Sequence, residues 1–270
     1  MVESTFKELE HQAWLAKAEI YRDEFGKITA RAIDPILDTF GDLARRTLLD
    51  VACGTGELTS AAAARGAISK GLDFAATMVE TARQKYPRIQ FSEGDAENLP
   101  YADGTFDAIV CSFGLLHLQE PDKAIGEVRR VLKAGGRYTF TSWCGPDQGG
   151  DFFKILIGAI QKHGTFDVLL PPAPPLFRFG DMEECSNSLL NGGFVDPAVQ
   201  IIELEWSTQD ASSIVEFVYK SMVRTSMVLR MQSEKARKEI HRSLIEGAES
   251  YRQGNLIRLR FPATLATART

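Results

Sequence analysis

The first part of the chain has the hydrophobic spacing of helices. Between residues 8 and 40, apolar side chains recur every three or four positions, which predicts two helices broken near Gly26 and ended by Gly41. Pro35 is expected to start a turn or a new segment, because proline restricts the backbone around it. Residues 1–45 are therefore predicted to be a helical cover in front of the rest of the chain.

A strand-and-helix unit then repeats over residues 46–143. Its predicted strands are the apolar runs in TLLDVACGTG, ISKGLDF, IQFSEGD, TFDAIVCSF and RYTFTSW, and its helices include PDKAIGEVRRVLKAGG, which is expected to end at the glycine pair. Strands that alternate with helices form a parallel sheet covered on both faces. Right-handed crossovers then make the predicted fold a doubly wound α/β sheet.

The pattern loosens after the fifth predicted strand. Residues 144–190 contain a helical pattern and a run with four prolines, which predicts an insertion that covers a pocket. Residues 191–270 are predicted to hold a strand at AVQIIELEW, a polar helical stretch over 211–252 and a last strand at NLIRLRFPATLATAR. Pro262 is expected to confine that last strand to a bulge or an unpaired position. The whole chain is interpreted as a single domain.

Composition excludes several classes of function. The formal net charge of −5 argues against a nucleic-acid binder, which would rely on neutralising phosphates. No apolar run approaches the ~18 residues of a membrane span, and the N-terminus lacks a signal-peptide core. The four cysteines and four histidines are scattered without metal-ligand spacing. We therefore expect a cytoplasmic protein without a metal; no feature of the sequence specifies its oligomeric state.

The glycine loop LLDVACGTGELT is the first candidate binding site. It follows a predicted strand and opens a helix, so its backbone N–H groups should face a ligand. A dinucleotide loop has G-x-G-x-x-G, but the third glycine position is Thr59 here. Asp50 precedes the loop, and a carboxylate repels a pyrophosphate but attracts an ammonium group. The loop therefore favours a ligand that carries no phosphate.

Two further acids follow at predicted strand ends. Asp73 ends the second strand, at about the distance beyond the loop where an acid accepts hydrogen bonds from a ribose diol. Asp95 ends the third strand, where its side chain and the following amide can meet an adenine edge. A ligand with an ammonium group, a ribose and an adenine, but no phosphate, is S-adenosylmethionine.

These motifs, in order, resemble those of class I S-adenosylmethionine-dependent methyltransferases. LLDVACGTGELT, GLDFAATMVETAR, FSEGDAENLPYADGTFDAIVCSFGLLHL and PDKAIGEVRRVLKAGGRYTFTSW carry the resemblance, which is nearest to the ubiquinone/menaquinone-biosynthesis C-methyltransferases and related small-molecule enzymes. It covers residues 46–143 continuously and extends loosely to NGGFVDPAVQIIELEW and the terminal strand. The resemblance implies a Rossmann-like, mostly parallel sheet of seven strands, with an antiparallel last strand beside the fifth.

The resemblance also implies a set of cofactor contacts. Tyr21 would be an aromatic lid over the cofactor, Asp50 would hold its methionine amino group, and the loop of Ala52, Gly54 and Gly56 would lie against the methionine and the ribose. Asp73 would bind the ribose hydroxyls, and Phe74 and Met78 would pack on the nucleoside. Asp95 and Ala96 would recognise the adenine, and Ser112 and Phe113 would line the methionine side. Two positions depart from the family pattern: Ala52 replaces a glycine and Ala75 replaces a serine. Both are small, so the pocket should be retained.

The acceptor side has less specific signals. His117 is either a hydrogen-bonded loop residue or a group that faces the substrate and accepts a proton. Trp143 either lines the acceptor pocket or anchors the insertion. The fourth-strand motif SFGL differs from the [DNS]-P-P-[YFW] of enzymes that methylate base amino groups, so a small-molecule acceptor is expected beneath residues 144–190 and the N-terminal helices. No catalytic residue is identified. A nucleotide-dependent oxidoreductase and a non-catalytic S-adenosylmethionine-binding module remain the alternatives to a methyltransferase that yields S-adenosylhomocysteine.

Overall fold

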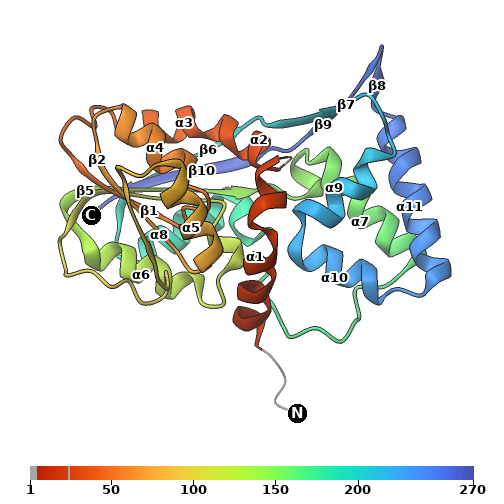
Figure 1. Ribbon diagram of the computed structural model, residues 1–270, viewed down its shortest axis with the longest axis horizontal. Coiled ribbons are helices and arrows are strands. Elements are labelled where there is room, and N and C mark those ends of the chain that lie inside the picture. Colours follow the sequence, from red (N-terminus) through yellow and green to blue (C-terminus); the bar gives the residue numbers. More distant parts are fainter. Residues whose placement is uncertain (1–4, 24) are drawn as a thin grey trace.

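A seven-stranded sheet forms the centre of the protein (Figure 1). The computed structural model describes residues 5–23 and 25–270, and the side chains of 5–15 and 25–270. The strand order is β3-β2-β1-β4-β5-β10-β6, and β10 is antiparallel to both of its neighbours. The strands are β1 (Thr47–Val51), β2 (Ile68–Asp73), β3 (Gln90–Glu93), β4 (Phe106–Ser112), β5 (Leu132–Trp143), β6 (Val195–Ile202) and β10 (Ala263–Arg269). The predicted sheet, with its antiparallel strand beside the fifth, is confirmed.

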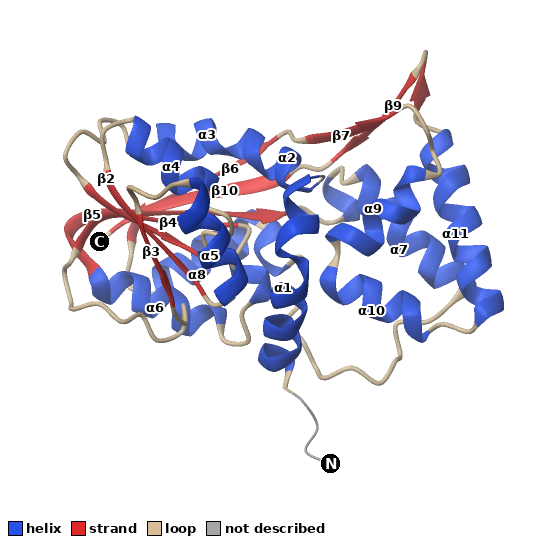
Figure 2. Cartoon of the chain, viewed as in Figure 1, coloured by secondary structure: helices blue, strands red, loops and turns tan. Residues whose placement is uncertain are grey.

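Helices cover both faces of this sheet (Figure 2). Alternation along β4 explains the two layers: Ala108 and Val110 pack on the face of α3 and α4, whereas Ile109 and Cys111 pack on the face of α6 and α8. The covering helices are α3 (Ile33–Asp38), α4 (Glu57–Ala64), α5 (Ala76–Lys85), α6 (Pro121–Val131) and α8 (Met182–Asn191). Because both faces of β4 are buried, its sequence from Ala108 to Cys111 is continuously apolar, and this is the pattern from which the strand was predicted.

The N-terminal helices run beside the sheet rather than within its layers. α1 (Phe6–Asp23) packs on α5, and it is followed by α2 (Phe25–Thr29) and the 3₁₀ turn η1 (Ala30–Ala32). Gly26, near which a break was predicted, lies inside α2; the position between α1 and α2 is outside the described residues, so the break stays a prediction. Pro35 was expected to start a new segment, but it lies in the first turn of α3, where the missing N–H costs no helical hydrogen bond.

Two predicted strands are each divided between two sheets. AVQIIELEW gives β6 and β7 (Glu205–Thr208), and the last predicted strand gives β9 (Leu256–Arg260) and β10. β7, β9 and β8 (Arg252–Gln253) form a small antiparallel sheet. Pro262 separates β9 from β10 because it has no N–H to donate, while its carbonyl accepts a hydrogen bond from the amide of Cys144 at 2.9 Å.

One predicted helix end was wrong. The segment after Pro121 was expected to remain helical up to its glycine pair, but α6 ends at Val131 and β5 begins at Leu132. Leu132 is extended and buried, so its side chain packs in the sheet rather than continuing the helix. Gly135 has a φ of 74°, which suits an irregular start of the strand.

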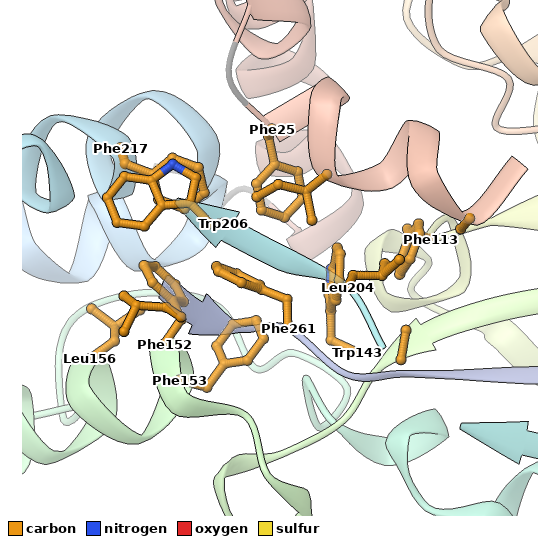
Figure 3. Close-up of a cluster of buried hydrophobic side chains, with 14 of the residues drawn as sticks. Phe25, Phe113, Trp143, Phe152, Phe153, Leu156, Leu204, Trp206, Phe217 and Phe261 are labelled. Atoms are coloured by element: carbon orange, nitrogen blue, oxygen red, sulfur yellow. The ribbon is translucent and has the colours of Figure 1, made fainter. Parts of the chain in front are cut away.

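A helical region stands beside the end of the seven-stranded sheet (Figure 1). A cluster of buried aromatic side chains packs in this part of the molecule (Figure 3). The helical region contains α7 (Asp151–His163), α9 (Ser213–Ser221), α10 (Val223–Met231) and α11 (Glu234–Glu249), with the 3₁₀ turns η3 (Pro146–Gln148) and η4 (Arg178–Gly180) nearby. Phe152 and Phe261 stack with ring centroids 4.5 Å apart, and Phe217 meets both rings. The polar stretch predicted over 211–252 is thus helical, but it buries an apolar face. Among the described helices, none is long and apolar enough to cross a membrane.

Candidate cofactor and acceptor site

The loop between β1 and α4 has an unusual backbone. Ala52, Gly54 and Gly56 have φ values of 57°, 53° and 87°, all in the left-handed region. Ala52 takes this conformation although its side chain makes it unfavourable. Its methyl group also explains Gly114 across the loop, because a Cβ at Gly114 would lie 2.7 Å from the Cβ of Ala52. The loop is therefore held in one shape by small residues on both sides.

This loop forms one wall of a cavity of about 280 Å³. The cavity lies at the carboxyl ends of β1, β2, β3 and β4, where parallel α/β sheets bind ligands. The structure brings most of the predicted site residues to its lining. These are Asp50, Ala52, Gly54, Asp73, Phe74, Met78, Asp95, Ala96, Ser112, Phe113 and His117.

Two predicted residues with described side chains are not part of this lining. Gly56 is absent from the wall; a Cβ there would lie 2.8 Å from the ring of Phe91, so the glycine allows close packing beneath the loop. Trp143 is 3% exposed and also lies outside the lining. The side chain of Tyr21 lies outside the described residues, so the lid predicted there stays a prediction.

Asp50 is buried at the bottom of the cavity. The hydroxyl of Thr59 donates to its Oδ2 at 2.6 Å, which gives a role to the residue that replaces the third glycine of a dinucleotide loop. Burial raises the pKa of Asp50 to about 7, and the nearby charge of Asp73 acts in the same direction. Among the described residues, no cation faces this carboxylate. The site would therefore gain from a positive group and would oppose a pyrophosphate.

Asp73 is built into the same loop. Its Oδ2 accepts a hydrogen bond from the amide of Gly54 at 2.8 Å, and its Oδ1 accepts one from the amide of Ala75 at 2.9 Å. Burial raises the pKa of Asp73, although these amides oppose the shift. Each carboxylate oxygen has a second lone pair, so the residue can still accept hydrogen bonds from a diol. Asp73 thus shapes the loop and faces the cavity at once.

A third acid, Asp95, pairs with a residue that sequence reasoning missed. Lys7 on α1 reaches Asp95 Oδ2 at 2.7 Å and Glu97 Oε2 at 2.6 Å. Burial of the Lys7 amine opposes its charge, but the hydrogen bonds to the two carboxylates outweigh burial and raise the pKa of Lys7. Lys7 and Glu97 also line the cavity. The N-terminal helix is therefore tied to the end of the cavity where adenine recognition is predicted.

α1 makes a second polar contact with the cavity wall. Glu10, 4% exposed, lies 2.9 Å through its Oε2 from Nδ1 of His117, which belongs to the 3₁₀ turn η2 (Leu115–His117). The indole N–H of Trp14 donates to the same Oε2 at 3.2 Å. Trp14 also meets the His117 ring edge-on, with centroids 4.9 Å apart. Sequence reasoning found His117 but not its two partners on α1.

The end of β4 presents an aromatic wall. Phe113 has a φ of 54°, and its amide donates to Thr141 Oγ1 at 3.1 Å, which fixes this strained turn. Trp143 stacks on Phe113, with ring centroids 4.0 Å apart and ring planes 19° apart. Both side chains are labelled in Figure 3. Ser112 shares a hydrogen bond of 3.3 Å with Thr141. Trp143 therefore supports the cavity wall from behind rather than forming it.

Another part of the wall comes from α2, η1 and the first residue of α3, where Gly26, Lys27, Thr29, Ala30 and Ile33 line the cavity. No described residue of segment 144–190 lines this cavity. That this segment covers an acceptor stays a prediction. The described residues also contain no cluster of three or more histidine, cysteine or acidic side chains that could hold a metal ion.

Comparison with known proteins finds a family model that matches the strand-and-helix core. Residues 49–140 are similar to the family described as methyltransferase domain. The matched segment contains Asp50, Asp73 and Asp95, so the three acids at the cavity lie inside it.

Curated relatives match over a similar length. The demethylmenaquinone methyltransferase of Renibacterium salmoninarum is 39% identical over 114 residues, which are 42% of this chain and 48% of that protein. The enzyme of the same name from Thermus thermophilus is 38% identical over 125 residues, 44% of this chain and 55% of that protein. The chain thus spans about half the length of the curated relatives it matches.

Solved structures share the fold over nearly the whole chain. Phosphoethanolamine N-methyltransferase 2 of Haemonchus contortus, solved with S-adenosylhomocysteine, has a TM-score of 0.59 at 16% identity and covers 99% of this chain and 60% of that one. SpnF, a cyclase, has a TM-score of 0.57 at 21% identity, over 99% of this chain and 97% of that one. These likenesses show a shared fold, and the names of the two proteins show that this fold carries more than one kind of chemistry.

Proposed function

We propose that this protein transfers a methyl group from S-adenosylmethionine to a small-molecule acceptor. The observation that carries the proposal is the cavity itself, which gathers three strand-end acids and a left-handed glycine loop in one place. The match to the methyltransferase family and the relatives named demethylmenaquinone methyltransferase support the same activity. The relatives match only part of the chain, so the identity of the acceptor does not follow from their names.

The residues of the cavity fit this cofactor. The buried carboxylate of Asp50 would face the ammonium group, which would favour its charged form against the effect of burial. Asp73 would accept the ribose hydroxyls, and Asp95 with the amide of Ala96 would meet the adenine. Phe74 and Met78 would pack on the nucleoside. A pyrophosphate would instead meet two buried acids, which disfavours the oxidoreductase alternative.

The chemistry of the cofactor defines what the protein must do. S-adenosylmethionine, when bound, would supply a methyl group to a lone pair of the acceptor. The bond between the methyl carbon and sulfur would break, and its two electrons would stay on sulfur. The protein then has to orient the two molecules and to exclude water. Phe113, Ala30 and Ile33 provide apolar surface beside the loop for the second molecule, next to the polar Lys27 and Thr29.

The size and charge of the site favour a small acceptor. The acids that line it, together with a net charge of −5, disfavour a nucleic-acid backbone. The walls contributed by α1 and α2 leave a cavity of about 280 Å³, the scale of small-molecule sites. We therefore infer that the methyl acceptor is a small molecule held between α2 and Phe113.

Calorimetry tests the proposal before the acceptor is known. S-adenosylhomocysteine should bind with one-to-one stoichiometry at a Kd in roughly the micromolar range, and NADH should give no heat of binding. Heat from NADH and none from S-adenosylhomocysteine would overturn the proposal in favour of a nucleotide-dependent oxidoreductase.

A second measurement separates an enzyme from a binding module. Radiolabelled S-adenosylmethionine should transfer label to small molecules in a cell extract, and mass spectrometry identifies the product. Binding of S-adenosylhomocysteine without any transfer would favour the non-catalytic module, or another reaction on the same fold.

A further inference from the structure

We propose that Glu10 and His117 form a proton-accepting pair, and that the methyl acceptor therefore carries an acidic O–H or N–H. This inference rests on the proposed function and adds a substrate class to it. It concerns two elements far apart in the sequence, α1 and η2, which meet at the wall of the cavity. Glu10 is a positioning residue in this pair, and His117 is the group that meets the acceptor.

The hydrogen bonds of Glu10 show which atoms donate and which accept in this pair. The indole N–H of Trp14 can only donate, so Oε2 of Glu10 is an acceptor in that contact. The same oxygen is 2.9 Å from Nδ1 of His117, and a carboxylate oxygen there accepts a hydrogen bond from Nδ1–H. The lone pair of the neutral imidazole is then on Nε2. The carboxylate thus selects one tautomer of the ring.

Nε2 is available for chemistry. His117 lines the cavity and its side chain is 24% exposed, whereas Glu10 is buried. Within the described residues, Nε2 has no hydrogen-bond partner. Trp14 covers the ring edge-on and shields the contact with Glu10 from water. The imidazole is therefore held through Nδ1 by Glu10, while Nε2 is free to accept a proton. This is the arrangement of an oriented general base.

The proton balance defines the acceptor class. As the acceptor bonds the methyl group, its O–H or N–H bond breaks, the bonding electrons stay on the acceptor, and the proton goes to Nε2. The imidazolium that results is stabilised by Glu10, and it later releases the proton to water. A phenol-like O–H is acidic enough to need only such a base. A thioether or a tertiary amine has no proton to lose and would not use the pair.

The pair depends on the position of α1. Glu97, 3% exposed, binds Lys7 of α1 and also accepts hydrogen bonds from the amides of Gln119 and Glu120 at 2.9 and 3.0 Å. These amides lie two and three positions after His117 in the chain. One buried carboxylate therefore holds both the helix that supplies Glu10 and the segment that supplies His117. The proton-accepting pair is complete only when α1 lies on the cavity.

Nitrogen NMR of the histidine rings tests the pair without an acceptor. The chain has four histidines, and His117→Gln assigns the signal of His117. At a pH where the ring is neutral, the pair predicts protonation at Nδ1. Glu10→Gln should mix the two tautomers, whereas Glu8→Gln, on an exposed position of the same helix, should leave the spectrum unchanged. Protonation of the wild-type ring at Nε2, or an unchanged spectrum in Glu10→Gln, would overturn the proposal.

Kinetics provide an independent readout with two probe acceptors, catechol as a phenol and dimethyl sulfide as a thioether. Wild type should methylate catechol, and Glu10→Gln should lower kcat roughly 10- to 100-fold while KM changes less than threefold. Turnover of dimethyl sulfide alone, or an unchanged kcat in Glu10→Gln, would contradict the pair. Calorimetry with S-adenosylhomocysteine keeps the two questions apart: its binding supports the proposed function even if the pair fails.

Discussion

The two halves of the cavity are built in different ways. The half formed by β1, β2 and β3 consists of side chains at strand ends, and each acid accepts a hydrogen bond from a backbone amide or a hydroxyl at the same edge of the sheet. The half formed by α1, α2 and Phe113 depends on contacts between segments far apart, with Trp143 and the aromatic cluster behind it. We call the first the local half and the second the assembled half. Single substitutions can alter the local half, whereas the assembled half depends on packing across the whole molecule.

The largest expected effect is on the stability of the assembled half. Phe152 is fully buried and stacks on Phe261, so Phe152→Ala should lower the free energy of unfolding by about 3–5 kcal/mol through the cavity it leaves. Denaturant titration measures this loss. Phe166→Ala, at a position 48% exposed, is the matched control and should change stability little. Equal effects of the two substitutions would contradict the role given to the cluster.

Asp73→Asn tests the local half. The amide replaces one hydrogen-bond acceptor by a donor and removes the charge, so a lost bond of roughly 1.5–3 kcal/mol should weaken S-adenosylhomocysteine binding about ten- to over a hundred-fold. Calorimetry measures the change. Glu93→Gln, an exposed acid at the end of β3 outside the cavity lining, is the control. An affinity of Asp73→Asn within twofold of wild type would mean that Asp73 does not contact the ribose.

Asp50→Asn should change how the stability of the protein depends on pH. Because the pKa of Asp50 is about 7 when folded and near 3.8 when unfolded, the folded state binds more protons between these values, and ionisation of Asp50 destabilises it as pH rises. The variant should therefore be more stable than wild type at pH 8, by about 1–4 kcal/mol, and equal to it below pH 4. Thermal unfolding across this range is the measurement. A variant less stable at pH 8 would show that Asp50 is stabilised by partners rather than strained by burial.

A smaller effect is expected at Ala52. Glycine takes a φ of 57° without steric cost, so Ala52→Gly should relieve strain of about 1 kcal/mol in the folded state and lose a similar amount through the flexibility of the unfolded chain. The net change in stability should stay within roughly 0.5 kcal/mol. Gly54→Ala, with a φ of 53°, should instead destabilise by about 1 kcal/mol. Denaturant midpoints distinguish the two.

The sequence predicted best those site residues whose positions follow from the strand that carries them. Asp50, Asp73 and Asp95 each lie at or just after the carboxyl end of a strand. Parallel strands bring these ends to one edge of the sheet, so the three acids could be placed together in advance. Thr59 was noted only as a departure from a dinucleotide loop, yet its hydroxyl holds Asp50. A loop motif defines positions better than it defines hydrogen bonds.

The missed residues have partners far away in the chain. Lys7 and Glu10 bind residues 88 and 107 positions later, and no local pattern links such pairs. The available signal was the spacing of Lys7, Glu10 and Trp14 along one helix face, where polar residues interrupt an apolar stripe. The division of the last strand at Pro262 was missed for the same reason, because the second sheet is formed by β7, which is distant in sequence.

The ion pairs of Lys7 have a consequence for the timing of ligand exchange. α1 carries part of the wall, so we expect a bound molecule of nucleoside size to leave past this helix. Lys7, whose side chain is partly exposed, holds the helix to the rim through the partly exposed Asp95 and the buried Glu97. Salt screens such contacts. The residence time of a ligand should therefore shorten as ionic strength rises, even for an uncharged ligand that feels no screening itself.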